Sequence, residues 1–119
     1  MKSNHSIKYD LEERTFRFAK SVIEYVRYLS KGIPDSEIGR QLVRSAGLVG
    51  ASYIEANESL SKKDFLMRVK ISKKEAKESK YWLSLSTPKS NYEHLKTELM
   101  CESEELVKIF GAIIRNTTV

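Results

Sequence analysis

The sequence predicts an all-α fold, an up-down-up-down antiparallel four-helix bundle that forms one domain over residues 1–119. Three observations lead to this prediction. Apolar residues recur every three or four positions, which is the period of an amphipathic helix, and no segment alternates apolar and polar residues as a half-buried strand does. Only two prolines and five glycines interrupt the chain. Short links between long amphipathic helices make consecutive helices antiparallel neighbours.

The first helix is expected at about residues 10–31. Asp10 followed by Glu13 is typical of a capping box, and Gly32 and Pro34 are typical of a helix end. Its core-facing residues should be Leu11, Phe18, Val22, Tyr25, Val26 and Leu29. The second helix is expected at about residues 36–58, and its core-facing residues should be Ile38, Leu42, Ser45, Val49, Ser52, Tyr53 and Ala56.

The third helix is expected at about residues 62–86, because Ser61 and Asp64 suit its start and Pro88 follows its end. Its core-facing residues should be Phe65, Val69, Ser72, Ala76, Ser79 and Leu83. The fourth helix is expected at about residues 91–116, with a second capping-box pair at Ser90 and Glu93. Its core-facing residues should be Leu95, Leu99, Leu106, Ile109 and Ile113.

The second helix is apolar or small on almost every side from Leu42 to Ala56. A helix that is apolar all round is buried all round, and 119 residues provide too little material to wrap it. We therefore expect a homo-oligomer. The candidate interface residues are Val43, Gly47, Gly50 and Ile54, with Met67, Ile71 and Trp82 on a second apolar face of the third helix. Close packing inside one bundle is the alternative role for the two glycines.

Charged residues within these apolar faces need partners. Arg44 and Glu55 are the charges of the 42–56 segment, and Glu75 and Glu78 are candidate partners for Arg44. We expect these four residues to be partly buried, paired structural charges that fix helix register, and a functional site is the alternative. Glu102 falls in the core stripe of the fourth helix, and its role stays open at this stage.

Basic residues concentrate on the third helix of a chain whose formal net charge is +5. At 100° per residue, seven lysines fall within an arc of about 120°, and such a stripe can follow a phosphate backbone. These candidate nucleic-acid-binding residues are Lys62, Lys63, Lys70, Lys73, Lys74, Lys77 and Lys80. The alternatives are a solvated face and neutralisation by the acidic fourth helix.

No motif for catalysis, metal binding or a cofactor is present. A di-metal bundle needs Glu-x-x-His pairs, and the pairs Glu55–Glu58 and Glu75–Glu78 have no histidine. The single cysteine, Cys101, the absence of a signal peptide and the absence of a membrane-spanning apolar run favour the cytoplasm.

Residues 44–83 carry a family resemblance. The matching residues are Arg44, Ser45, Gly50, Ala51, Glu55, Ala56, Ser61, Lys62, Lys63, Asp64, Phe65, Lys74, Glu75, Ala76, Glu78, Ser79, Tyr81, Trp82 and Leu83. This pattern resembles the bacterial four-helix-bundle protein family named for the 23S ribosomal RNA intervening sequence. The resemblance implies a ring-like homo-oligomer, expected as a pentamer, and an association with RNA. It implies no enzymatic activity.

These observations together predict a non-enzymatic, self-assembling four-helix bundle that contacts RNA or DNA by charge. Two alternatives stay open. One is a protein-binding adaptor without nucleic-acid binding, and the other is a metal-carboxylate enzyme.

Overall fold

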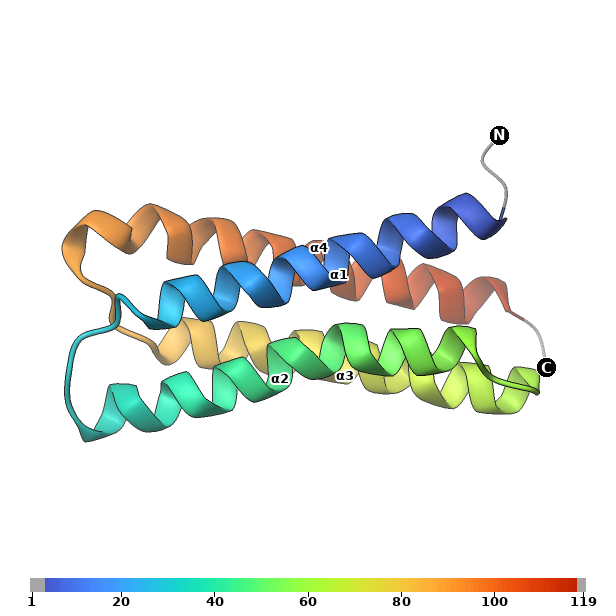
Figure 1. Cartoon of the computed structure of the whole chain (residues 1–119), viewed down its shortest axis with the longest axis horizontal. Helices are drawn as coiled ribbons and strands as arrows, with labels where there is room; N and C mark the ends of the chain where they lie inside the picture. Colours follow the sequence, from blue (N-terminus) through green and yellow to red (C-terminus); the bar gives the residue numbers. More distant parts are fainter. Residues whose placement is uncertain (1–3, 118–119) are drawn as a thin grey trace.

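A computed structural model of the chain describes the backbone of residues 4–117 and the side chains of residues 10–117. It contains α1 (Asn4–Val26), α2 (Ile33–Asn57), α3 (Lys62–Leu85) and α4 (Glu93–Asn116), with a short 3-10 helix, η1 (Ser90–Tyr92), before α4. Consecutive helices run antiparallel, and α1 begins at the end of the bundle where α4 ends (Figure 1). The predicted all-helical bundle is therefore confirmed, with no named strand among the described residues.

The core lies along the long axis of a molecule that measures 46 × 27 × 19 Å. Each helix buries most of its predicted apolar stripe there, and the largest fully buried side chains include Tyr25, Leu42, Leu83, Leu106 and Phe110. The predicted core residues that are only partly buried are Val26, Ile38, Phe65, Leu95, Ile109 and Ile113. Phe110 is a core residue outside the predicted stripe, although it lies four residues after Leu106 and so on the same helix face. Among the described residues, no helix has both the length and the hydropathy needed to cross a bilayer.

The boundary between the first two helices differs from the prediction. α1 begins at Asn4, so Asp10 lies inside the helix and does not cap it, and α1 ends at Val26. α2 begins at Ile33 and holds Pro34 in its first turn. Proline is tolerated there because the first N–H groups of a helix have no acceptor within it.

The loops after α1 and α3 pair with each other at the same end of the bundle. Leu29 and Pro88 form an isolated antiparallel bridge. The backbone N–H of Ser30 donates to the carbonyl of Thr87, and that of Lys89 donates to the carbonyl of Tyr28, each at 2.9 Å. This pairing takes residues 27–31 out of the first helix, where the sequence predicted them.

The two predicted serine caps have different outcomes. Ser61 caps α3 as predicted, since its hydroxyl accepts a hydrogen bond of 3.1 Å from the N–H of Asp64. The capping box at Ser90 is wrong, because Ser90 opens η1 and α4 has Tyr92 at its N-cap without a side-chain hydrogen bond. α4 therefore starts from a preceding 3-10 turn.

Candidate nucleic-acid interface

The inner face of α3 is built from small residues that let α2 come close. Ser72 donates to the backbone carbonyl of Val49 at 2.9 Å, and the hydroxyls of Ser45 and Ser79 share a hydrogen bond of 2.9 Å. Ala76, which lies between Ser72 and Ser79 in the sequence, is fully buried. The hydroxyl groups of these serines therefore have hydrogen-bond partners in the seam, the contact between α2 and α3, as buried polar groups require. Because this face is committed to α2 and the core, the lysines of α3 lie outside it.

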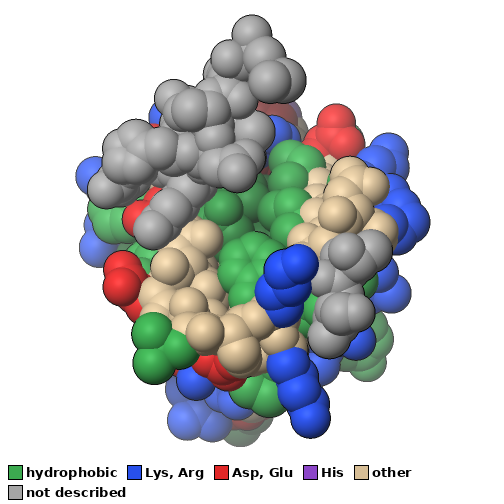
Figure 2. Space-filling model, turned by 90° about the vertical axis from the view of Figure 1, so that its right-hand side faces the viewer, with side chains coloured by type: hydrophobic (Ala, Val, Ile, Leu, Met, Phe, Trp, Pro, Cys, Tyr) green, Lys and Arg blue, Asp and Glu red, His purple; other side chains and the backbone are tan. Residues whose placement is uncertain are grey.

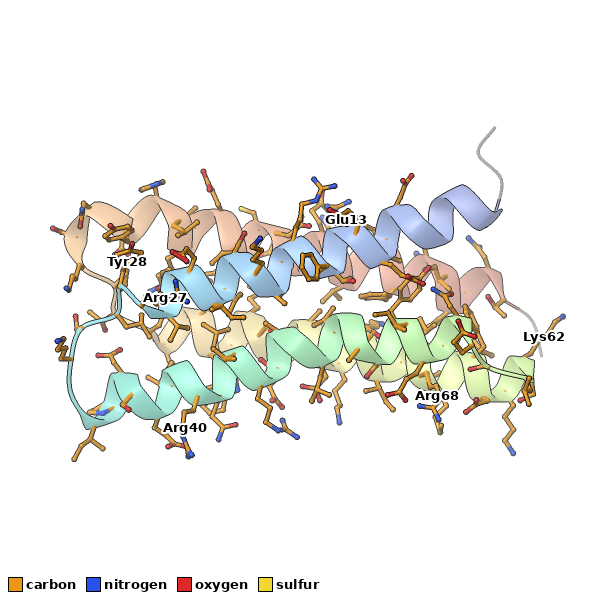
Figure 3. All side chains as sticks on the ribbon, viewed as in Figure 1. Glu13, Arg27, Tyr28, Arg40, Lys62 and Arg68 are labelled. Atoms are coloured by element: carbon orange, nitrogen blue, oxygen red, sulfur yellow. The ribbon has the colours of Figure 1, made fainter. Side chains whose placement is uncertain are left out.

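The lysine face of α3 consists of the seven predicted lysines, and the structure keeps it largely accessible. The exposed members are Lys62, Lys63, Lys70, Lys74 and Lys77, whereas Lys73 and Lys80 are partly buried. Figure 3 shows Lys62 extending away from the bundle at the end where α3 begins. In the end-on view of Figure 2, apolar side chains lie near the centre, and basic side chains lie along the lower and right-hand rim.

Acidic residues of α4 and of α3 itself neutralise only one part of the lysine face. Lys80 pairs with Glu104 at 2.7 Å, and Lys74 lies 3.9 Å from its chain neighbour Glu75. The other five lysines of the face make no ion pair with another described residue. These five are Lys62, Lys63, Lys70, Lys73 and Lys77. Most of the positive charge of α3 is thus available to a partner.

An aromatic residue that the sequence analysis did not select lies in line with these lysines. Tyr81 is 57% exposed. Its ring meets the ring of Trp82 edge to face, with centroids 5.1 Å apart and planes at 74°. At 100° per residue, Tyr81 also falls within the arc of the seven lysines. Its place beside them could therefore have been predicted from the sequence.

Two of the four paired structural charges, Arg44 and Glu55, are less buried than predicted. Arg44 lies 3.8 Å from Glu78, and their side chains are 62% and 37% exposed. Glu55 pairs with Arg68, which also contacts Asp64 at 3.3 Å. Arg44 and Glu55 are therefore exposed in the single chain, because α1 and α3 cover only the inner side of α2.

Glu78 is partly buried, as expected, and Glu75 is the most buried of the four. Glu75 is 4% exposed, and its Oε1 atom accepts no hydrogen bond from a described residue. Burial raises the pKa of its carboxyl group, and Glu78 raises it further, whereas Lys74 and Arg44 act in the opposite direction. The buried Nε1 of Trp82 likewise has no hydrogen-bond partner among the described residues.

The structure separates the two glycines of the candidate oligomer interface. A Cβ on Gly50 would lie 3.0 Å from the Thr15 hydroxyl of α1, whereas a Cβ on Gly47 would meet nothing within 4 Å. Gly50 therefore serves the crossing of α1 and α2 within the chain. The other α2 candidates, Val43, Gly47 and Ile54, lie on its exposed side.

The second apolar face is only partly accessible. Met67 is exposed, but Ile71 is partly buried and Trp82 packs against the core cluster. Two further apolar residues, Phe16 and Ile23 of α1, are 60% and 44% exposed. Both lie outside the inward stripe predicted for α1, and their seven-residue spacing places them on one side of that helix.

Glu102 forms an ion pair with a residue of another helix, which the periodicity of its own helix could not predict. Nε and Nη2 of Arg14 donate to the two carboxylate oxygens of Glu102, each at 2.7 Å. The pair joins α1 to α4 beside a groove of about 610 Å³. A bidentate arginine–carboxylate contact fixes the relative position of two helices, so the role of Glu102 in this fold is structural.

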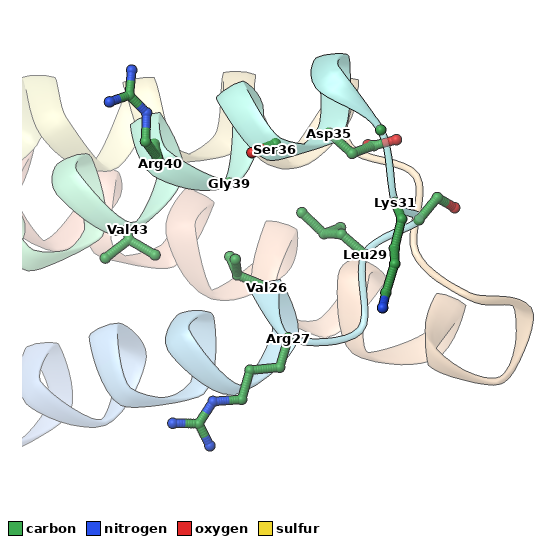
Figure 4. A pocket seen from close by; sticks show the side chains of 11 residues that line it. Val26, Arg27, Leu29, Lys31, Asp35, Ser36, Gly39, Arg40 and Val43 are labelled. Carbon is green, nitrogen blue, oxygen red and sulfur yellow. The ribbon is translucent and has the colours of Figure 1, made fainter.

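A second groove, of about 620 Å³, lies at the turn between α1 and α2. Figure 4 shows Val26 and Leu29 within it and Arg27, Lys31 and Arg40 around them. Arg27 pairs with Glu24 at 3.1 Å and Arg40 with Glu37 at 2.8 Å. Because its arginines pair with neighbouring glutamates, this groove is a weaker candidate for binding a polyanion than the lysine face.

No group of three or more His, Cys, Asp and Glu side chains is positioned to hold a metal ion within the part of the chain that the structure describes. The glutamates of the pairs Glu55–Glu58 and Glu75–Glu78 that the structure places in a contact do not converge on one point. Glu55 contacts Arg68, Glu78 contacts Arg44, and Glu75 is buried.

Comparison with known proteins agrees with the fold. A profile described as 23S rRNA-intervening sequence protein matches residues 8–112. The chain is also similar to a crystal structure from Bacteroides thetaiotaomicron VPI-5482, a protein of unknown function from the S23 ribosomal protein family. The two share 25% sequence identity and a TM-score of 0.73, over 88% of this chain and 98% of that one. A search of curated proteins found no match. Because the profile covers nearly the whole bundle, the chain belongs to the family of 23S rRNA-intervening sequence proteins.

Proposed function

We propose that this chain is a non-enzymatic, self-assembling four-helix-bundle protein that contacts RNA or DNA through the lysine face of α3. The main support is the arrangement of that face, where five of the seven lysines make no ion pair with another described residue. Unpaired lysines attract phosphates and release counterions from nucleic acid, a contact that needs no base-specific readout. The family name refers to 23S ribosomal RNA, which makes RNA the first ligand to test.

Self-assembly would strengthen this contact. The exposed apolar residues Phe16, Ile23, Val43 and Ile54 on α1 and α2 favour association with further copies. A ring of copies repeats the lysine face, and repetition raises the effective concentration of weak binding sites. The same apolar residues also suit a different protein, so an adaptor without nucleic-acid binding is the second candidate function.

A mobility-shift titration with structured RNA, single-stranded RNA and duplex DNA tests the proposal. We expect binding that weakens with salt, with a slope of about −0.7 per phosphate contact on single strands. Changing Lys70, Lys74 and Lys77 to Glu should abolish it and leave the helical circular dichroism spectrum unchanged, because all three are exposed. No shift up to about 100 µM protein, the weak limit of non-specific binding, would contradict the proposal and favour the adaptor.

The matched control changes three exposed lysines elsewhere, Lys20, Lys31 and Lys89, to Glu. Both triple variants have the same net charge, so a loss caused only by overall charge would appear in both. We expect the control variant to bind clearly more tightly than the α3 variant. Equal loss in the two variants would remove the assignment to the lysine face.

A further inference from the structure

The line of lysines on α3 continues into an aromatic side chain. Lys70, Lys74, Lys77 and Tyr81 follow one another in steps of four, three and four residues, which places them on one side of a helix. At 1.5 Å of rise per residue, the line from Lys70 to Tyr81 is about 16 Å long. A partner that followed the three lysines along the helix would therefore reach the tyrosine next.

Tyr81 is both exposed and held in place. More than half of the residue is accessible, at 57%. Its ring packs edge to face on Trp82, which is itself partly buried against the core. A ring that is restrained in this way loses little conformational freedom when a ligand stacks on it.

We propose that Tyr81 stacks on an unpaired base while the lysines of α3 bind the adjoining phosphates, so that the ligand class is single-stranded nucleic acid. This inference rests on the proposed function and narrows it. Bases in a duplex are already stacked on one another, and only unstacked bases of single strands, loops and ends are free to stack on an aromatic side chain. Stacking accepts any base, because every base has a π face.

Trp82 provides a reporter for this contact, because it is the only tryptophan of the chain and it touches Tyr81. The ligands are a single-stranded oligonucleotide, an abasic strand with the same number of phosphates, and a duplex of the same length. We expect the single strand to change the fluorescence of Trp82 and to bind more tightly than the abasic strand. The duplex should bind through charge without this fluorescence change.

Changing Tyr81 to Leu keeps an apolar side chain and removes the aromatic ring. We expect about 5- to 150-fold weaker binding of the single strand, the range for the loss of one stacked base, and unchanged binding of the abasic strand. Tyr81→Phe should bind like the unmodified protein. Leu85→Ala is the control, because it removes an exposed apolar side chain of α3 that has no ring.

The outcomes separate this inference from the proposed function. If no polyanion binds, the proposed function fails. If all three ligands bind alike and Tyr81→Leu changes nothing, contact by charge stands and base stacking is wrong. If Tyr81→Leu changes the mass of the assembly in light scattering, Tyr81 belongs to a contact between copies, and the stacking role is overturned.

Discussion

Glu75 is a carboxyl group buried in the seam between α2 and α3. Burial and the neighbouring Glu78 raise its pKa, and the opposing effects of Lys74 and Arg44 are smaller. The folded protein therefore holds the proton of Glu75 more tightly than the unfolded chain does. The resulting stabilisation is fully present below the pKa of the unfolded state and is lost as the pH rises through the pKa of the folded state.

We expect Glu75→Gln to raise the melting temperature at pH 7, because it removes the charge that burial disfavours. The gain should shrink as the pH falls towards about 4.3, the ordinary pKa of glutamate, where Glu75 is already neutral. Thermal unfolding followed from pH 4 to pH 8 measures this. Glu13→Gln, at an exposed site, is the control. A lower melting temperature for Glu75→Gln at pH 7 would show that the charged form is stabilised in the seam.

The two glycines of α2 should respond differently to alanine. At Gly47 a methyl group meets open space, so alanine should raise the free energy of unfolding by about 0.4–1 kcal/mol through its helix propensity. At Gly50 the methyl group would lie 3.0 Å and 3.3 Å from the side chain of Thr15. The crowding should cancel or reverse the gain there. Urea denaturation of both variants checks this, and equal gains at the two sites would contradict the close approach of α1.

Among the described residues, a salt bridge joins α1 to α4, and a stacked tyrosine pair lies where the loop after α1 meets η1. Arg14 binds Glu102 in the N-terminal half of α1. After the end of α1, Tyr28 stacks on Tyr92 with ring centroids 3.9 Å apart. The groove beside Arg14 lies along the same seam. The Arg14–Glu102 ion pair is therefore a polar contact that ties α1 to α4 in that half.

A double-mutant cycle with Arg14→Ala and Glu102→Ala measures the contribution of this pair. We expect a coupling energy of about 1 kcal/mol, the upper end for partly exposed pairs, because the contact is bidentate. The coupling should fall in high salt, since exposed charges are screened. Additive effects of the two substitutions would mean that the pair contributes nothing to the seam.

For the whole molecule, the apolar residues left exposed on α1 and α2 bear on assembly. We expect a homo-oligomer larger than a dimer at micromolar concentration, measured by gel filtration with light scattering. Gly47→Leu should lower its mass, because the bulky side chain blocks the close approach of another helix, whereas Gly47→Ala should change the mass less. A monodisperse monomer for the unmodified chain would contradict this prediction.

The helices and their inward faces were predictable from the sequence because periodicity is a local property of the chain. Leu42 and Val49 of α2, Leu83 of α3 and Leu106 of α4 each belong to a predicted apolar stripe, and all four are fully buried. The helix ends were less predictable. The end of α1 depends on the pairing of its loop with Thr87 and Lys89, which are far away in the sequence.

The sequence by itself determined the all-helical fold, the family and the residues that share each helix face. Only the tertiary structure decided which neighbour covers each face, because that depends on contacts between helices distant in the chain. It placed Thr15 against Gly50, Arg14 against Glu102, and Glu104 against Lys80. A helical wheel aligns Tyr81 with the lysines, but whether they are accessible follows from the bundle, which buries the serine and alanine face of α3 and turns the opposite face to solvent.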